Sequence, residues 1–159
     1  MPGITLDAGA LIAIDRNDRR IAVLLARAGE TRARITIPGS ALAQAIRRPE
    51  RQVRLARLVR QPTTDVVDLG RVDATNVSRL LAASGTADVV DAHIVVCARR
   101  AHQRVVTSDP DDLCLLDPSL DVFTSDPHDH KPAFGSAWAE LAPCDEGPPV
   151  CPAPSIRHP

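Results

Sequence analysis

The 159-residue sequence has few aromatic side chains and almost no lysine. Phe, Tyr and Trp make up 2% of it, and Tyr is absent. A core must therefore be built from Leu, Val, Ile and Ala, and the first 125 residues offer only Phe123 for stacking on RNA bases. The single lysine is Lys131, so arginine is the only strongly basic side chain in the first 125 residues. Arginine is well suited to binding phosphate groups. A preference for arginine over lysine also results, however, from the codon usage of a GC-rich genome.

Long apolar runs and paired cysteines are missing as well. No run approaches the ~20 apolar residues of a membrane helix, and no basic-then-apolar segment opens the chain. We therefore expect a cytoplasmic protein with no membrane partner. The four cysteines form no CxxC pair, which gives no sign of a zinc site or a disulfide framework. Cys97 and Cys114 lie in apolar stretches and are expected to be small core residues.

Short apolar stretches alternate with helical patterns along the first 124 residues. Asp18 is the expected N-cap of one helix and Gly29 its stop. Strands alternating with helices predict an α/β fold, with a parallel sheet of four to five strands between two layers of helices. We predict strands over 3–7, 34–38, 65–69, 104–109 and 121–123, and helices over 8–14, 18–29, 40–47, 50–60, 71–83 and 88–101.

The composition changes after Thr124. Residues 126–159 hold 8 of the 14 prolines and show little periodicity, which is typical of an irregular tail, and we expect this tail to be disordered. Its histidines and cysteines match no metal-ligand spacing. The sequence therefore predicts one domain over 1–125, followed by a Pro-rich tail over 126–159.

Acidic residues stand in three segments that a doubly wound sheet would bring together. Asp7 and Asp109 end apolar strands, whereas Asp88 and Asp91 lie on one side of the apolar helix "DVVDAHIVVCARR". Ligands of such sheets bind beyond the carboxyl ends of the strands, where the strand order reverses. Carboxylates within about 4–6 Å repel one another unless a cation lies among them, and their hard oxygens suit Mg²⁺ or Mn²⁺. The structural alternatives are that Asp88 caps its helix and that Asp109 begins a turn.

Three blocks, "LDAGALIAI", "DVVDAHIVVCARR" and "VVTSDPDDL", resemble in order and spacing the signature blocks of PIN domains. More narrowly, they resemble VapC-type toxins of bacterial toxin–antitoxin pairs, over roughly residues 3–124. The resemblance implies a PIN-like fold and a Mg²⁺- or Mn²⁺-dependent endoribonuclease acting as a toxin. It implies that Asp7, Asp91 and Asp109 are catalytic metal ligands, with Asp88 as an additional ligand. It also implies an antitoxin protein as partner and a homodimer.

The sequence departs from this family at one position. The family usually carries a Glu on the helix after the second strand, where Gln44 stands here. Gln can coordinate a metal through its carbonyl oxygen or orient a water, but it adds no charge. Either Asp88 restores the charge, or the chain is a weak or inactive PIN-fold binding module. A phosphotransfer domain of the haloacid dehalogenase kind needs a second Asp where Gly9 stands, so we set it aside.

Arginines recur along the helix predicted over 50–60. Arg51, Arg54 and Arg57 would share one face of that helix, which predicts contact with the phosphates of an RNA backbone. The alternatives are a solvated helix face and a docking surface for the antitoxin.

Overall fold

A computed structural model describes residues 3–124 of the chain; the predicted tail over 126–159 lies outside these residues. Five strands form one sheet in the order β3-β2-β1-β4-β5, and every pairing is parallel. The predicted α/β class and parallel sheet are therefore confirmed. The strands are β1 (Gly3–Leu6), β2 (Arg34–Pro38), β3 (Thr64–Val67), β4 (Arg104–Thr107) and β5 (Val122–Thr124).

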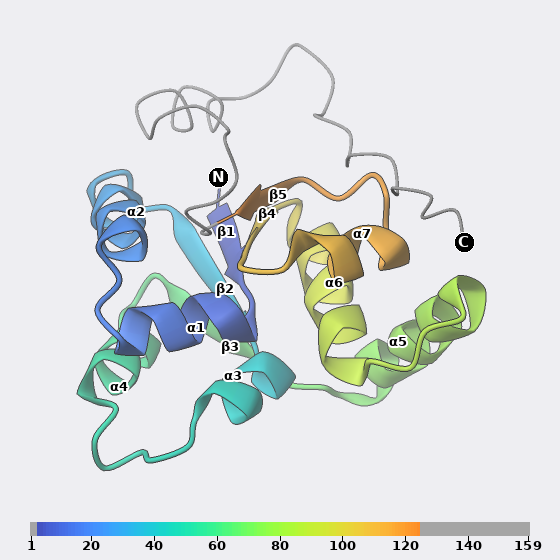
Figure 1. Ribbon diagram of the computed structural model, residues 1–159, viewed down its shortest axis with the longest axis horizontal. Coiled ribbons are helices and arrows are strands. Elements are labelled where there is room, and N and C mark those ends of the chain that lie inside the picture. The colour runs from blue at the N-terminus through green and yellow to red at the C-terminus, as the bar shows by residue number, and fades with distance from the viewer. Residues whose placement is uncertain (1–2, 125–159) are drawn as a thin grey trace, which may run out of the picture.

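Helices connect the strands and form two groups that flank the sheet (Figure 1). In the described part of the chain they are α1 (Ala8–Asp15), α2 (Arg19–Glu30), α3 (Gly39–Ala45), α4 (Val53–Val59), α5 (Arg71–Ser84), α6 (Val89–Ala101) and α7 (Pro110–Leu116). Helix α1 packs against α2, α3 and α4, whereas α5, α6 and α7 pack against one another. Helix α6 also contacts β1, β2 and β4.

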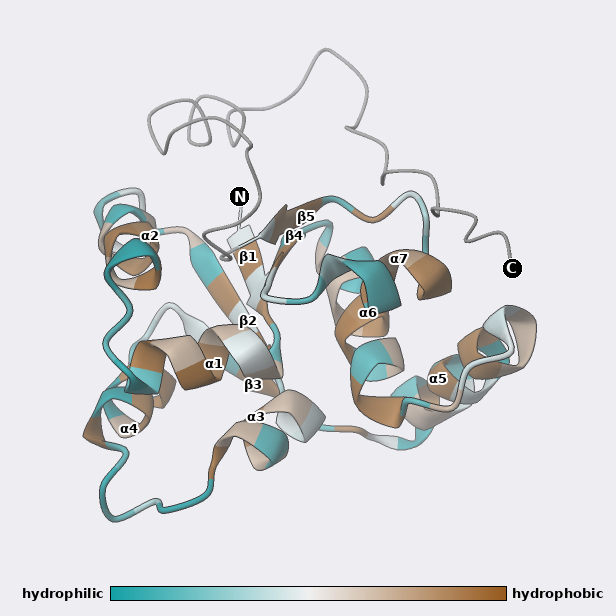
Figure 2. Cartoon of the chain, in the orientation of Figure 1, coloured by the Kyte–Doolittle hydropathy of each residue, from teal (hydrophilic) through white to brown (hydrophobic). Residues whose placement is uncertain are grey.

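The core is aliphatic, as the scarcity of aromatic residues predicts. Strands β1 and β4 are buried along their whole length, and Leu6, Leu11 and Val105 have no exposed surface. The segment between α3 and α4, in contrast, is hydrophilic (Figure 2). Cys97 is a free, buried core residue, as predicted. Cys114 is half-buried on α7 and takes part in a disulfide, so the expectation that it is a small core residue outside any disulfide is wrong.

Several element boundaries differ from the prediction. Asp18 does cap α2, because its carboxylate accepts hydrogen bonds from the backbone N–H groups of Arg20 and Ile21 at 2.8 and 3.3 Å. Gly29 does not stop this helix, which continues to Glu30. Helix α4 begins at Val53 rather than at residue 50.

The late start of α4 has a local cause. The buried side chain of Gln52 accepts hydrogen bonds from the backbone N–H groups of Arg47 and Arg48 at 2.9 and 3.1 Å, and it donates to the carbonyl of Ala45 at 3.1 Å. Gln52 thus ties the preceding turn together and holds residues 47–51 outside the helix. Arg51 therefore does not share a helical face with Arg54 and Arg57, contrary to the prediction.

Within residues 3–124, no helix taken singly has both the length and the apolar character to cross a membrane. Helices α5 and α6 reach that threshold only when they are combined, and the chain bends by 112° between them.

Candidate metal centre

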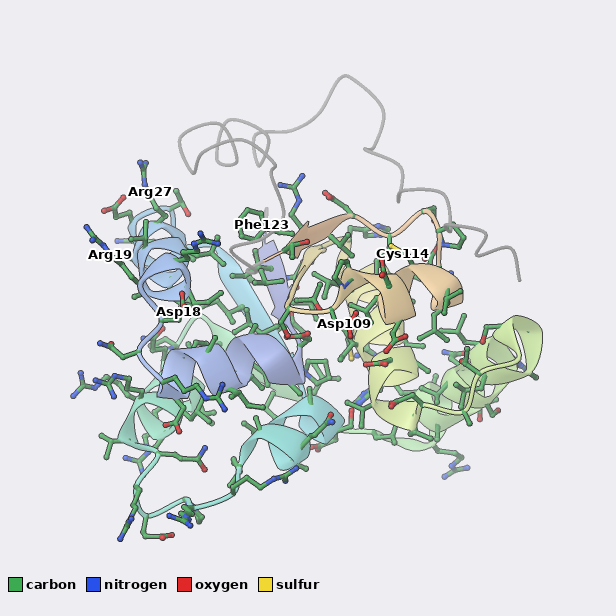
Figure 3. The ribbon with its side chains drawn as sticks, in the orientation of Figure 1. Asp18, Arg19, Arg27, Asp109, Cys114 and Phe123 are labelled. Carbon is green, nitrogen blue, oxygen red and sulfur yellow. The ribbon has the colours of Figure 1, made fainter. Side chains whose placement is uncertain are left out.

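Asp7 and Asp109 follow two strands that lie side by side. Strands β1 and β4 pair with Leu6 opposite Val106, and the backbone N–H of Asp7 donates to the carbonyl of Val106 at 3.1 Å. The strand order reverses between these two strands, so both acids lie at the switch point of the sheet. Figure 3 shows Asp109 where β4 leads into α7. Asp109 is exposed at the N-cap position of α7, but its side chain makes no capping hydrogen bond.

The Asp7 carboxylate is held in one orientation. It is buried and accepts a hydrogen bond from the backbone N–H of Ala10, so it also caps α1. Burial raises the pKa of Asp7 most, and the charge of Asp109 raises it further. Hydrogen bonds from the Thr107 side chain and from the backbone of Ala10 and Ser108 lower this pKa, but the net shift is upward. Asp7 thus stands in a site where its own charge is unfavourable.

Gly9 permits the close approach of α1 to the end of β4. A Cβ atom at Gly9 would lie 3.1 Å from Cβ of Ser108 and 3.4 Å from Oδ2 of Asp7, and it would clash with Oγ of Ser108. The absence of a side chain therefore lets the first turn of α1 pack beside Asp7 and Ser108.

Asp88 and Asp91 play different parts in α6. Asp88 is exposed and caps the helix, because its carboxylate accepts hydrogen bonds from the backbone N–H groups of Val90 and Asp91 at 2.8 and 3.0 Å. Asp88 therefore caps its helix, as the structural alternative predicts. Of the two acids, only Asp91 is partly buried. This does not remove Asp88 from the cluster, since its charge acts directly on Asp91.

Asp91 is the point at which the acids converge. Burial raises its pKa most, followed by the charges of Asp88, Asp112, Asp7 and Asp109, and together they raise the pKa from 3.8 to about 6. Only carboxylates that lie near one another produce such mutual effects. The four acids predicted from the sequence therefore come from β1, α6 and the end of β4 to one edge of the sheet.

Asp112 is an additional acid that the sequence reasoning missed. It lies exposed in the first turn of α7, a helix absent from the prediction, and its charge affects Asp91 more than that of Asp7 or Asp109. The signal was present in "DPDDL". Pro110 occupies the first helical turn after Asp109, and acids are favoured in that turn by the helix dipole.

The remaining predicted residues lie on α3, on α4 and between these helices. Gln44 is exposed in the last turn of α3, a helix that packs against α1 and α6. Arg54 and Arg57 are exposed on α4 and line a cavity of about 180 Å³ between α1, α2 and α4, whose lining includes Ile14, Leu25 and Leu58. Arg51 is exposed in the turn before α4.

The donor set of the cluster fits a hard divalent cation. Among residues 3–124, no Arg or His forms an ion pair with any of the five acids, although four other aspartates do have such partners. The acids offer only carboxylate oxygens, and their mutual repulsion would be relieved by positive charge. Mg²⁺ and Mn²⁺ are the ions that such oxygen donors prefer.

The arrangement of strands and helices is that of a PIN-like α/β fold. No family model and no curated protein sequence matches the chain. Its structural neighbours are VapC/FitB PIN-domain toxins of toxin–antitoxin complexes, over about 77% of the chain.

Three solved structures illustrate this likeness. One is VapBC2 from Rickettsia felis bound to a DNA fragment from its promoter, with 15% sequence identity and a TM-score of 0.57. The match covers 77% of this chain and 98% of the Rickettsia felis chain. DNA-bound VapBC from Salmonella typhimurium is 20% identical, with coverage of 78% and 98% and a TM-score of 0.57. FitAcB from Neisseria gonorrhoeae is 15% identical, with coverage of 76% and 96% and a TM-score of 0.53. The shared feature at these identities is the fold.

Proposed function

We propose that the domain over 1–125 is a metal-dependent endoribonuclease of the toxin class, which hydrolyses phosphodiester bonds in RNA, and that 126–159 is a tail outside it. The observation that carries this proposal is the convergence of acids on the partly buried Asp91 at the switch point of the sheet, where burial and then the charges of these acids raise the pKa of Asp91 to about 6. Groups with strongly shifted pKa values at such a position are typical of functional sites. The PIN-like fold supports the same activity.

Each acid has a role in the proposed site. Asp7, Asp91 and Asp109 would hold Mg²⁺ or Mn²⁺, while Asp88 and Asp112 would add negative charge around them. A bound ion of this kind lowers the pKa of a coordinated water and stabilises charge on a phosphate. The backbone N–H of Ala10 keeps the Asp7 carboxylate in place before the ion binds. Because the Asp91 carboxyl has a pKa of about 6, it carries a proton in weakly acidic solution, which it would have to lose before it could hold an ion.

The alternative proposal is a PIN-fold binding module without catalysis. Gln44 supports it, because this position contributes no charge where the resembling family has a Glu. Asp112 supports activity instead, since it brings a carboxylate to the cluster from α7. We favour the nuclease because the charges of four acids act on Asp91 without any contribution from Gln44.

An antitoxin is the proposed protein partner, in line with structural neighbours that were crystallised with antitoxins and DNA. Arg54 and Arg57 have two possible ligands, an RNA backbone or this partner. The apolar side chains of Ile14, Leu25 and Leu58 line the same cavity as these arginines. Apolar lining favours a protein segment over a phosphate backbone, so we assign this surface to the antitoxin.

The decisive experiment compares metal binding with RNA cleavage. Calorimetry with Mn²⁺ and a cleavage assay on structured and single-stranded RNA are run on the wild type and on Asp7→Asn. The matched control is Asp65→Asn, which removes a partly exposed carboxylate of β3 that pairs with Arg34. We expect Asp7→Asn to lose both Mn²⁺ binding and cleavage, while the control keeps both. Cleavage that persists in Asp7→Asn refutes the proposal, and Mn²⁺ binding without cleavage in the wild type favours the binding module.

A further inference from the structure

A second cluster of ligand atoms lies between α5 and α6, built from side chains other than the five acids. Asp73, His93 and Cys97 each offer one ligand atom, and these atoms lie within 4.8 Å of one another. His93 and Cys97 are four residues apart on α6 and thus share one face of that helix, while Asp73 comes from the first turn of α5. All three residues are buried, with exposed fractions of 5%, 0% and 1% respectively.

His93 has a ring nitrogen without a partner. Its Nδ1 lies 2.7 Å from Oγ of Ser40, but its Nε2 is buried and makes no hydrogen bond within the described structure. The nearest acid, Oδ2 of Asp73, is 4.0 Å away, which is too long for a hydrogen bond. Buried polar atoms without partners are rare in native proteins, so this one points to a missing ligand.

The contact with Ser40 favours a metal-binding form of the imidazole. When Nδ1 donates its proton to Oγ of Ser40, Nε2 carries a lone pair directed away from that contact. Histidines that bind metals through one nitrogen commonly donate from the other nitrogen in this way, which holds the ring in position. The Ser40 hydroxyl therefore supplies the supporting hydrogen bond that such a site requires.

Arg100 does not block the cluster. Its guanidinium donates to both carboxylate oxygens of Asp73 at 2.7 and 2.9 Å, and its side chain is half exposed. Each carboxylate oxygen has two lone pairs, so Asp73 can accept these hydrogen bonds and still ligate an ion. Burial raises the pKa of the Cys97 thiol to about 11, while the charge of Arg100 opposes this rise. An ion that binds Cys97 must therefore displace its proton.

We propose that Asp73, His93 and Cys97 bind a Zn²⁺ ion, with the fourth position left to a water. One sulfur, one nitrogen and one oxygen form a mixed donor set that suits zinc, whereas the acids around Asp91 offer oxygen alone. The ion would join α5 to α6, the helix that carries Asp91. This site is independent of the proposed nuclease activity.

Cobalt is the probe that distinguishes the two centres, because a thiolate–Co²⁺ charge-transfer band requires sulfur coordination. The full chain is titrated with Co²⁺ under argon without added thiol, and then with Zn²⁺. We expect about one equivalent of Co²⁺ to produce the band and Zn²⁺ to abolish it, while excess Mg²⁺ leaves it unchanged. A wild-type protein that binds no Co²⁺ through sulfur overturns the proposal.

Variants assign the sulfur to Cys97. We expect Cys97→Ser to lose the band, whereas a control that combines Cys114→Ser, Cys144→Ser and Cys151→Ser, and so leaves Cys97 as the only cysteine of the chain, keeps it. A band that survives in Cys97→Ser, or disappears in the control, overturns the assignment. If Cys97→Ser does not fold, Asp73→Asn preserves the shape and the thiol. This variant is expected to weaken Zn²⁺ binding by about tenfold or more, and an unchanged affinity also overturns the proposal.

Discussion

Replacing Asp91 by Asn removes one charge at the point where the acids converge. The pKa of Asp91 in the folded chain is about 6, above the value of 3.8 for an unperturbed Asp. Between these values the folded state binds more protons than the unfolded state. Stability therefore falls as pH rises, and the penalty is complete above pH 6. For a fully buried group, this loss in the free energy of unfolding would be about 3 kcal/mol at neutral pH. Because Asp91 is partly exposed, we expect about 1–2 kcal/mol after solvent screening.

Asp91→Asn should therefore stabilise the metal-free protein while it disables the site. In EDTA at pH 7 we expect the Tm of the variant to exceed that of the wild type by about 3–6 °C. Between pH 5 and pH 7 the Tm of the variant should change less than the Tm of the wild type. In Mn²⁺ we expect RNA cleavage to fall by about 100-fold or more, because a ligand matters at least as much as the groups that support it. Thermal melts in EDTA and a cleavage assay in Mn²⁺ measure the two effects separately.

Asp88→Ala is the matched comparison within the same helix turn. It removes the side chain that accepts hydrogen bonds from the N–H groups of Val90 and Asp91, and loss of such an N-cap costs about 0.5–2 kcal/mol. Removing the Asp88 charge also relieves part of the repulsion at Asp91, so Asp88→Ala should be between neutral and destabilising, whereas Asp91→Asn should be stabilising. If Asp91→Asn is less stable than the wild type in EDTA and still cleaves RNA, Asp91 is a structural residue of α6 and the metal centre has been misassigned.

Three other substitutions test separate parts of the structure. Gln44→Glu should tighten Mn²⁺ binding in calorimetry because it adds a carboxylate; unchanged affinity and cleavage would mean that Gln44 does not face the acids. Gly9→Ala should weaken Mn²⁺ binding because its Cβ would clash with Oγ of Ser108 and force this exposed side chain beside Asp7 to move; the better helix propensity of Ala offsets part of the strain, so thermal stability should change by less than about 1 kcal/mol, and undiminished Mn²⁺ affinity would contradict this. Burial raises the pKa of Asp117, but hydrogen bonds, first among them that from Arg99 at 2.6 Å, outweigh it and hold this pKa below its usual value. Asp117→Asn should therefore cost about 1–3 kcal/mol in urea unfolding at pH 7 and less at pH 3, where wild-type Asp117 gains a proton on unfolding; equal costs at both pH values would count against this ion pair.

Local patterns were sufficient for most of the elements and for part of the site. Apolar runs with β-branched residues placed each strand within about two residues of its observed ends. Asp18 was recognisable as an N-cap because capping depends on a few consecutive residues. Asp7 and Asp109 could be assigned to one edge because parallel strands, once predicted, end on the same side of a sheet.

The sequence by itself determined that the sheet is parallel and that acids follow two of its strands, because both properties depend on residues adjacent in the chain. Only the tertiary structure decided that β1 lies beside β4, and that α7 brings Asp112 toward Asp91. It alone placed Asp73 of α5 beside the face of α6 that carries His93. These juxtapositions depend on packing between segments far apart in the chain, and the periodicity of one helix does not specify which helix will cover it.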